Sequence, residues 1–244
     1  MKSNFSFINV YKKTSAKSKV VTQLLYGDIF KKIQKKGKWI KIKNKSDNYE
    51  GFVKNENFSK VTKNTHKILS LSANLYSYPS LKKKIKKKLS FGSKIEVMER
   101  KNNFYRFNNL WVSGDDIKLI KYKKKDVFKN VYMFVDTKYK WGGKHYKGVD
   151  CSGLVQLFLN FNNLYCPRDT KDQIKYFKNK VKLKNIKKND LIFWKGHVGI
   201  ALSKKNLIHA YGPFKKTIVM PIKKTIDRIY KTANLKVIGV RRIL

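Results

Sequence analysis

Cysteine is scarce in this chain, with only Cys151 and Cys166 among 244 residues. Two cysteines cannot form the disulfide framework that small secreted domains need, so their number is consistent with a reducing compartment. No apolar run reaches the roughly 18 residues that could span a membrane, and residues 1–14 lack the apolar stretch of a signal peptide. We therefore expect a cytoplasmic protein without a membrane span, in which Cys166 is structural.

Acidic residues are also few, with 15 against 58 basic residues and a formal net charge of +43. Such a charge can indicate binding to nucleic acid or to an acidic surface. However, 52 of the basic residues are lysine and six are arginine, whereas proteins that read bases favour bidentate arginine. We favour a general lysine bias over specific nucleic-acid binding, with weak non-specific attraction to polyanions as its consequence. Phosphate-binding loops, nucleotide fingerprints and zinc-ligand patterns are missing, so we expect no cofactor and no metal.

The first half of the chain contains an internal repeat. Tyr11 and Gly27 recur as Tyr76 and Gly92, at an offset of 65 residues, and residues 39–42 and 52–53 have similar counterparts at 104–107 and 111–112. Each copy is a run of short alternating strands with polar turns, which is typical of a small barrel. The 41% of hydrophobic residues suffices for globular cores.

Cys151 stands at the start of a predicted amphipathic helix. Leu154, Val155, Phe158 and Leu159 recur at helical spacing on the same face as the cysteine. The unpaired N–H groups and the helix dipole of a first turn stabilise an anion, so this position favours a thiolate and a lowered thiol pKa. The alternative is a small buried cysteine that packs as a hydrophobic residue.

Two of the four histidines fall in a predicted hairpin. Residues 191–194, 197–202 and 207–211 indicate strands, and 203–206 a tight connection between the last two. This spacing places His197 directly opposite His209, with Cβ atoms roughly 5 Å apart. A cysteine, a histidine base and a second polar group that orients the base form the arrangement needed for nucleophilic catalysis. Two solvated histidines are the alternative, and a metal site is less favoured.

Two further segments flank this constellation. Residues 139–143, with Tyr139 and Trp141, end in paired glycines that let the backbone pass close to another surface. Thr170 and Gln173 have the spacing of a capping box that opens a second helix. Asp169 is either a local cap or a substrate contact.

Taken in order, these motifs resemble the NlpC/p60 family of cysteine peptidases, which cut peptides of the bacterial cell wall. The resemblance spans residues 127–244 and rests on residues 139–143, 150–156, 167–169, 190–193, 197–200 and 208–210. It implies that Cys151 is the nucleophile, His197 the general base, and His209 the residue that orients the base. Tyr139 is expected beside the thiol, where it helps to hold the oxyanion. The resemblance also implies a set of residues that line the substrate cleft: Trp141, Asp150, Ser152, Asp169 and Thr170.

The repeat resembles bacterial SH3 domains, so we predict two small all-β SH3-like barrels, 1–62 and 63–122, before an α+β papain-like domain at 123–244. The whole is similar to the tandem-SH3 γ-D-glutamyl-L-diamino acid endopeptidases, of the dipeptidyl-peptidase VI type. That likeness implies action on free L-Ala-γ-D-Glu-diaminopimelate peptides in cell-wall recycling, and we expect a monomer. It also implies that Asp28 and Tyr49 recognise the substrate amine, although Asp28 equally fits a turn residue. An exported wall-remodelling endopeptidase and a non-catalytic wall-binding protein are the alternatives.

Overall fold

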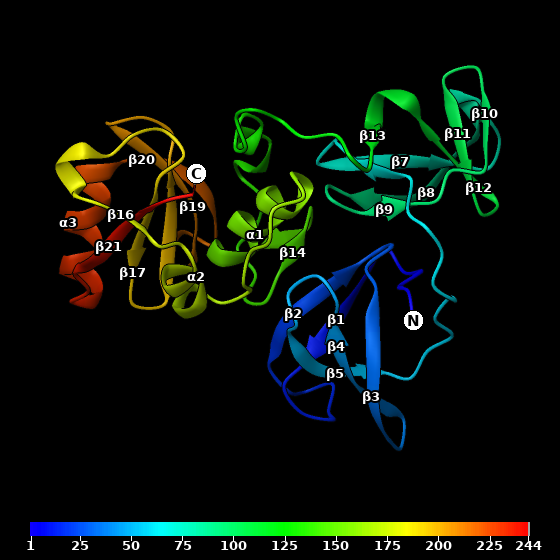
Figure 1. Ribbon diagram of the computed structural model, residues 1–244, viewed down its shortest axis with the longest axis horizontal. Helices are drawn as coiled ribbons and strands as arrows, with labels where there is room; N and C mark the ends of the chain where they lie inside the picture. The colour runs from blue at the N-terminus through cyan, green and yellow to red at the C-terminus, as the bar shows by residue number, and fades with distance from the viewer. Residues whose placement is uncertain (244) are drawn as a thin grey trace. The chain divides into compact units, whose positions relative to one another are not determined.

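The computed structural model describes residues 1–243 (Figure 1). The contacts within the chain group it into two compact units. Unit 1 comprises residues 1–123 and 144–146, and unit 2 comprises residues 124–143 and 147–244. The two copies of the repeat therefore lie in one unit, and residues 144–146, which the prediction assigned to the third domain, group with them. Tyr26 from the first copy packs on the hydrophobic core of the second copy, so the two copies share a packed contact.

A five-stranded antiparallel sheet forms the first copy in unit 1. Its strands are β1 (Phe7–Tyr11), β2 (Val20–Leu25), β3 (Phe30–Lys36), β4 (Trp39–Asn44) and β5 (Glu50–Lys54), in the order β2-β1-β5-β4-β3. Ile40 and Ile42 are buried on β4, while the alternating Lys41 and Lys43 are half-buried, as the period of two in a strand requires. These isoleucines join Val10, Leu24 and Val53 in one core.

The second copy repeats this strand order. Its five-stranded sheet, β10-β11-β12-β7-β8, contains β7 (Ser72–Tyr76), β8 (Lys84–Ser90), β10 (Glu99–Lys101), β11 (Phe104–Phe107) and β12 (Leu110–Ser113). A separate sheet, β13-β6-β9, is formed by β6 (His66–Ile68), β9 (Lys94–Ile95) and β13 (Ile117–Leu119). The short 3₁₀ helices η1 (Leu81–Lys83) and η2 (Gly114–Asp116) lie between strands.

Equivalent pairs confirm the repeat seen in the sequence. Tyr11 is paired with Phe52 in the first copy, and Tyr76 with Trp111 in the second. That the second copy is itself an SH3-like barrel stays a prediction.

The repeated glycines also share a backbone conformation. Gly27 and Gly92 have φ angles of 82° and 81°, which favour glycine. A Cβ on Gly27 would lie only 2.0 Å from the carbonyl oxygen of Lys94, so this turn has no room for a side chain.

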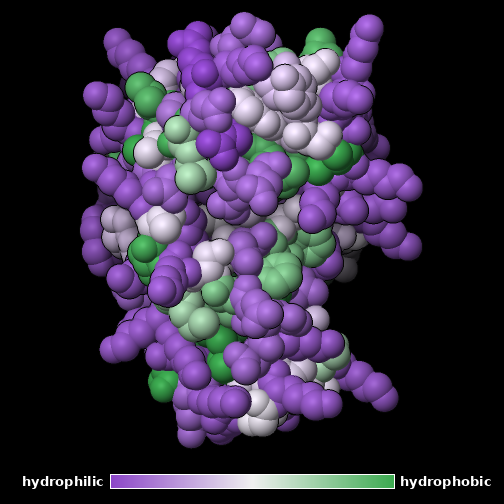
Figure 2. Space-filling view, turned by 90° about the vertical axis from the view of Figure 1, so that its right-hand side faces the viewer, coloured by the Kyte–Doolittle hydropathy of each residue, from purple (hydrophilic) through white to green (hydrophobic). Residues whose placement is uncertain are grey.

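Lysines dominate the exposed surface. On the edge strand β3, every residue after Phe30 is exposed, and most of them are lysine. Figure 2 shows hydrophilic side chains over most of the face in view. Charged edge strands resist pairing with other chains, so the lysines also protect the sheet against edge-to-edge aggregation.

Unit 2 is built on a six-stranded antiparallel sheet. Its order is β16-β21-β17-β18-β19-β20, with β16 (Asn179–Val181), β17 (Leu191–Trp194), β18 (His197–Ala201), β19 (Asn206–Tyr211), β20 (Lys216–Pro221) and β21 (Val237–Arg242). The helices are α1 (Cys151–Phe161), α2 (Thr170–Tyr176) and α3 (Ile222–Ala233). The remaining elements of unit 2 are η3 (Val131–Phe134), η4 (Leu183–Asn185), η5 (Gly212–Phe214) and the small β15 (Gly148–Val149), while β14 (Lys144–His145) belongs to unit 1.

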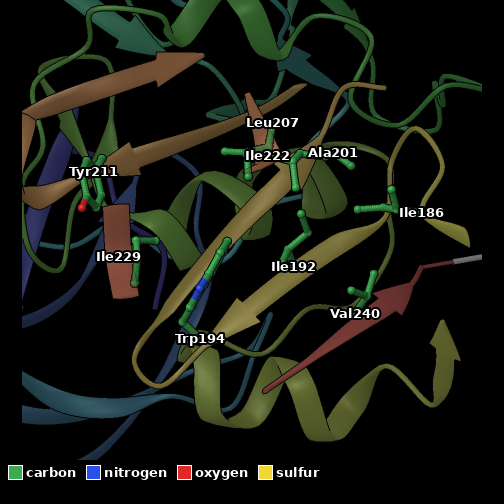
Figure 3. Close-up of a cluster of buried hydrophobic side chains, with 9 residues drawn as sticks. All are labelled: Ile186, Ile192, Trp194, Ala201, Leu207, Tyr211, Ile222, Ile229 and Val240. Atoms are coloured by element: carbon green, nitrogen blue, oxygen red, sulfur yellow. The ribbon is translucent and has the colours of Figure 1, made fainter. Parts of the chain in front are cut away.

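Both long helices pack on this sheet. Helix α1 contacts β18 and β19, and α3 contacts β20 (Figure 1). Ile222 and Ile229 of α3 join Trp194, Leu207 and Tyr211 of the sheet in a buried cluster (Figure 3). The predicted α+β arrangement of a cysteine-bearing helix on an antiparallel sheet is therefore present, and the finer description as papain-like stays a prediction. None of the helices in residues 1–243 is long and apolar enough to cross a membrane.

Candidate active site

Cys151 is the first residue of α1, as predicted, and its helix start is held by a dense polar cluster. Asp150 is the N-cap, and its Oδ1 accepts the N–H of Gly153 at 2.7 Å. Its Oδ2 accepts the N–H of Gly142 at 2.8 Å, which ties the segment containing Trp141 to the helix. An N-cap carboxylate satisfies N–H groups that the helix itself leaves unpaired.

Arg168 completes this cluster, and sequence reasoning missed it. Its Nη1 and Nη2 donate to the two carboxylate oxygens of Asp150 at 3.0 and 2.7 Å, and Nη1 also donates to Ser152 Oγ at 2.8 Å. All three side chains are buried. Arginine is rare in this lysine-rich chain, and Arg168 directly precedes the expected cleft residues Asp169 and Thr170. That position could have identified Arg168 from the sequence.

The thiol of Cys151 is buried, with 6% of the residue exposed. Its Sγ lies 4.0 Å from the carbonyl oxygen of Gly196. Burial, with the nearby Asp150 carboxylate, raises the thiol pKa to about 12, although the N–H groups of Val198 and Ser152 act against this. The sequence predicts a lowered thiol pKa, and this direction is wrong for the structure, because loss of solvent outweighs the favourable first turn of the helix.

His197 lies between the two residues whose backbone contacts the sulfur, and its side chain meets His209. The distance from His197 Nε2 to His209 Nδ1 is 2.9 Å. The strands are as predicted to within one residue, but the register differs. Ile200 is paired with Ile208, and continuing this pairing sets His209 opposite Gly199 instead of His197. The predicted directly opposite pair is therefore wrong by two residues, a shift that keeps both imidazoles on one face of the hairpin.

Both imidazoles are neutral at ordinary pH. Burial lowers the pKa of His197 to about 4, and burial with the neighbouring His197 lowers the pKa of His209 to about 2. His209 is fully buried and stacks on Tyr211, with ring centroids 4.7 Å apart and planes within 10°. This packing fixes the orientation of the His209 ring, and its Nδ1 is hydrogen-bonded to Nε2 of His197. The nitrogen of His197 that stays available for chemistry is therefore Nδ1.

Tyr139 lies near enough to Cys151 and Asp150 for their charges to act on its phenol. Burial and the proximity of Cys151 and Asp150 raise the pKa of its phenol, so the hydroxyl stays protonated and can donate a hydrogen bond. Its ring lies against Gly212, where an added Cβ would come within 3.6 Å of the ring carbons. Trp141, two residues further on, is 54% exposed.

The second helix begins at Thr170, but the predicted capping box is wrong. Asp169 is the N-cap residue and makes no side-chain capping bond. Gln173 is fully buried, and its Nε2 donates to the carbonyls of Ser152 and Pro167 at 3.0 and 2.9 Å. Its amide therefore bridges α2 to the start of α1 instead of capping its own helix. Asp169 and Thr170 are half-buried beside this bridge.

Asp28 and Tyr49 both belong to unit 1. The Asp28 carboxylate is 4% exposed and accepts the N–H of Leu25 at 2.9 Å, and it pairs with Lys94 at 3.3 Å and Lys144 at 3.9 Å. Burial alone raises its pKa, but the charges of the two lysines hold the pKa of Asp28 below its usual value. This environment matches the turn-residue alternative. Tyr49 is half-buried ahead of β5, and its N–H donates to Asp47 at 3.0 Å.

Within residues 1–243, no three His, Cys, Asp or Glu side chains gather in a way that could hold a metal ion.

The site therefore combines a cysteine at a helix start with a histidine that is hydrogen-bonded to a second histidine. This arrangement is typical of cysteine peptidases. Comparison with known proteins supports the same class. Residues 136–233 match the NlpC/P60 family, and residues 6–59 match the bacterial SH3 domain. The chain thus contains an NlpC/P60 domain, of a family of cysteine peptidases related to peptidoglycan, preceded by a bacterial SH3 domain.

The chain is similar to several named proteins. It is 30% identical over 87 residues to dipeptidyl-peptidase 6 of Lysinibacillus sphaericus, which covers 36% of this chain and 32% of that protein. It is 24% identical over 241 residues to gamma-D-glutamyl-L-lysine dipeptidyl-peptidase of Bacillus cereus, which covers 84% of this chain and 71% of that protein. Over its first three curated relatives, the chain spans 32%, 53% and 43% of their length.

The crystal structure of an NlpC/P60 family protein from Bacillus cereus has the same fold. It superposes with a TM-score of 0.85 at 18% identity, and the match covers 100% of this chain and 99% of that chain.

Proposed function

We propose that the protein is a cysteine endopeptidase that hydrolyses the γ-D-glutamyl–diamino acid bond of free L-Ala-γ-D-Glu-diaminopimelate peptides, in cytoplasmic cell-wall recycling. The observation that carries the proposal is the 2.9 Å pair of His197 and His209, placed where both backbone neighbours of His197 contact the sulfur of Cys151. Support for the substrate comes from the names of two relatives, dipeptidyl-peptidase 6 and gamma-D-glutamyl-L-lysine dipeptidyl-peptidase.

The protonation states favour a general-base reaction. At neutral pH the thiol is protonated and His197 is uncharged, because burial disfavours both ions. Nδ1 of His197 takes the thiol proton as sulfur attacks the γ-carbonyl carbon of D-glutamate. The imidazolium that forms is then stabilised by its hydrogen bond to Nδ1 of His209.

The reaction then proceeds through a thioester. The tetrahedral intermediate collapses when His197 returns its proton to the amine of the diamino acid, which leaves. Water, deprotonated by His197, attacks the thioester and releases L-Ala-γ-D-Glu, and the thiol regains its proton. The backbone N–H of Cys151, in the unpaired first turn of α1, and the phenol of Tyr139 are the oxyanion donors in this scheme.

Substrate selection rests on the residues that the family resemblance assigns to the cleft. The exposed indole of Trp141 and the half-buried Asp169 and Thr170 contact the peptide in this proposal. Asp150 and Ser152 act differently, because their side-chain oxygens are already bonded to Arg168. They hold the start of α1 in place more than they contact substrate.

The test compares L-Ala-γ-D-Glu-diaminopimelate with its N-acetylated form, by mass spectrometry of the products, with Cys151→Ala as the control. Cleavage of the free-amine peptide only, absent in Cys151→Ala, supports a recycling enzyme. Equal cleavage of both peptides favours a wall-remodelling endopeptidase, and cleavage of neither favours the non-catalytic alternative.

A further inference from the structure

Arg168 is a buried cation next to the candidate nucleophile, and the reaction outlined above gives it no step. Its residue is 2% exposed, and its guanidinium makes a two-pronged contact with both oxygens of Asp150. It also donates to Ser152 Oγ, while Ser152 Oγ donates to Asp150 Oδ1 at 3.3 Å. Buried arginine is rare unless it is paired, and this pairing is geometrically specific.

Asp150 poses a difficulty for cysteine chemistry. As N-cap it directly precedes Cys151, and its carboxylate organises the helix start and the N–H of Gly142. A bare carboxylate at this position would repel the negative charge that develops on sulfur, because two like charges a few Å apart in a buried site interact strongly. The site therefore requires the hydrogen bonds that the Asp150 carboxylate accepts, together with a nearby positive charge that offsets its negative charge.

We propose that Arg168 is a positioning residue that neutralises Asp150, so that the helix cap can stand beside Cys151 without opposing thiolate formation. The inference rests on the proposed role of Cys151 as nucleophile. Arg168 acts through Asp150 and touches neither substrate nor sulfur in this scheme. The charges agree in sign, since Asp150 raises and Arg168 lowers the pKa of both the Cys151 thiol and the Tyr139 phenol.

The titratable and charged groups around the thiol come from several elements. Asp150 lies at the start of α1, Arg168 just before α2, and Tyr139 in the segment before β14. His197 is contributed by β18, with His209 of β19 behind it. Burial keeps both histidines neutral at neutral pH, so the charge pair that faces the thiol is Asp150 with Arg168.

The test is the pH dependence of Cys151 alkylation by iodoacetamide, followed by peptide mapping that separates Cys151 from Cys166. Alkylation follows the thiolate fraction and requires no turnover. Arg168→Gln leaves Asp150 unopposed, so we expect the apparent thiol pKa to rise by about one unit or more and alkylation at fixed pH to slow by about tenfold or more. Asp150→Asn leaves Arg168 unopposed, so we expect a shift in the opposite direction.

The double variant Asp150→Asn/Arg168→Gln removes both charges, and we expect its alkylation rate to return to within about threefold of wild type. A merely structural role for the pair would move both single variants in the same direction and would not be repaired by the second change. That result, or a wild-type profile for Arg168→Gln, would overturn the proposal. If Arg168→Gln does not fold by circular dichroism, the proposal is tested with the other two variants: Asp150→Asn must lower the apparent thiol pKa, and the double variant must return it to near the wild-type value.

Failure of this proposal is distinguishable from failure of the proposed function. Opposite shifts in alkylation together with no cleavage of murein peptides would keep the role of Arg168 and reject the substrate assignment. Cleavage of murein peptides with no shift in the alkylation profile of either single variant would keep the substrate assignment and reject the role of Arg168.

Discussion

The hydrogen bond between His197 and His209 allows the effect of removing His209 on kcat/KM to be predicted. His209→Ala removes the acceptor that lies 2.9 Å from His197 Nε2. In the transition state this bond holds an imidazolium, and hydrogen bonds to charged groups contribute about 1.5–3 kcal/mol. At 1.4 kcal/mol per factor of ten, kcat/KM is expected to fall by roughly ten- to 150-fold. The assay is hydrolysis of L-Ala-γ-D-Glu-diaminopimelate, with thermal unfolding measured in parallel.

Two matched variants separate orientation from stability. His209→Asn places an amide oxygen near the position of the lost Nδ1 and is expected to keep more activity than His209→Ala. His66→Ala alters a half-buried histidine of unit 1 and is expected to leave kcat/KM unchanged. His209→Ala also empties a fully buried site and so destabilises the fold by about 2–5 kcal/mol. A kcat/KM for folded His209→Ala within about threefold of wild type would refute the orienting role.

Three further predictions concern backbone space, acid stability and the oxyanion donor. Gly27→Ala is expected to destabilise the protein far more than Gly37→Ala in denaturant unfolding, since an added Cβ lies 2.0 Å from the oxygen of Lys94 at Gly27 and meets nothing within 4 Å at Gly37; equal losses would contradict this. Because burial lowers the pKa of His197 from 6.5 to about 4, the unfolded chain binds more protons between these values. His197 alone should therefore lower the free energy of unfolding by about 3 kcal/mol on acidification through this window, and His209, whose pKa is lowered further, adds to the loss; a flat profile would count against both. Tyr139→Phe should lower kcat roughly 100- to 1000-fold while thiol alkylation stays near wild type; an unchanged kcat would remove the phenol from the oxyanion site.

Local pattern allowed accurate prediction of much of unit 2. The apolar period after Cys151 located the helix start, and the strand carrying Leu191–Trp194 was predicted at its true bounds. The repeat at an offset of 65 residues anticipated the matching strand orders in unit 1. These features depend on hydrophobic periodicity and turn residues, which can be recognised within short segments of the sequence.

The errors concern the hairpin register, the thiol pKa and the role of Gln173. The hairpin register depends on which residues close the connection, and here the pairs Ile200–Ile208 and Ala201–Leu207 shift it by two residues. The thiol pKa depends on burial by the surrounding chain, which a helix start alone does not reveal. The bond from Gln173 to Ser152 spans 21 residues, so the local capping spacing was a misleading signal.

The central claim is that Cys151 attacks the γ-D-glutamyl carbonyl. The most direct measurement is mass spectrometry of the protein quenched in acid during turnover of L-Ala-γ-D-Glu-diaminopimelate. We predict an L-Ala-γ-D-glutamyl group on the peptide that contains Cys151, together with free diaminopimelate, and neither product in Cys151→Ala. Hydrolysis of this peptide that persists in Cys151→Ala, with no acyl group on the cysteine of the wild-type protein, would contradict the account.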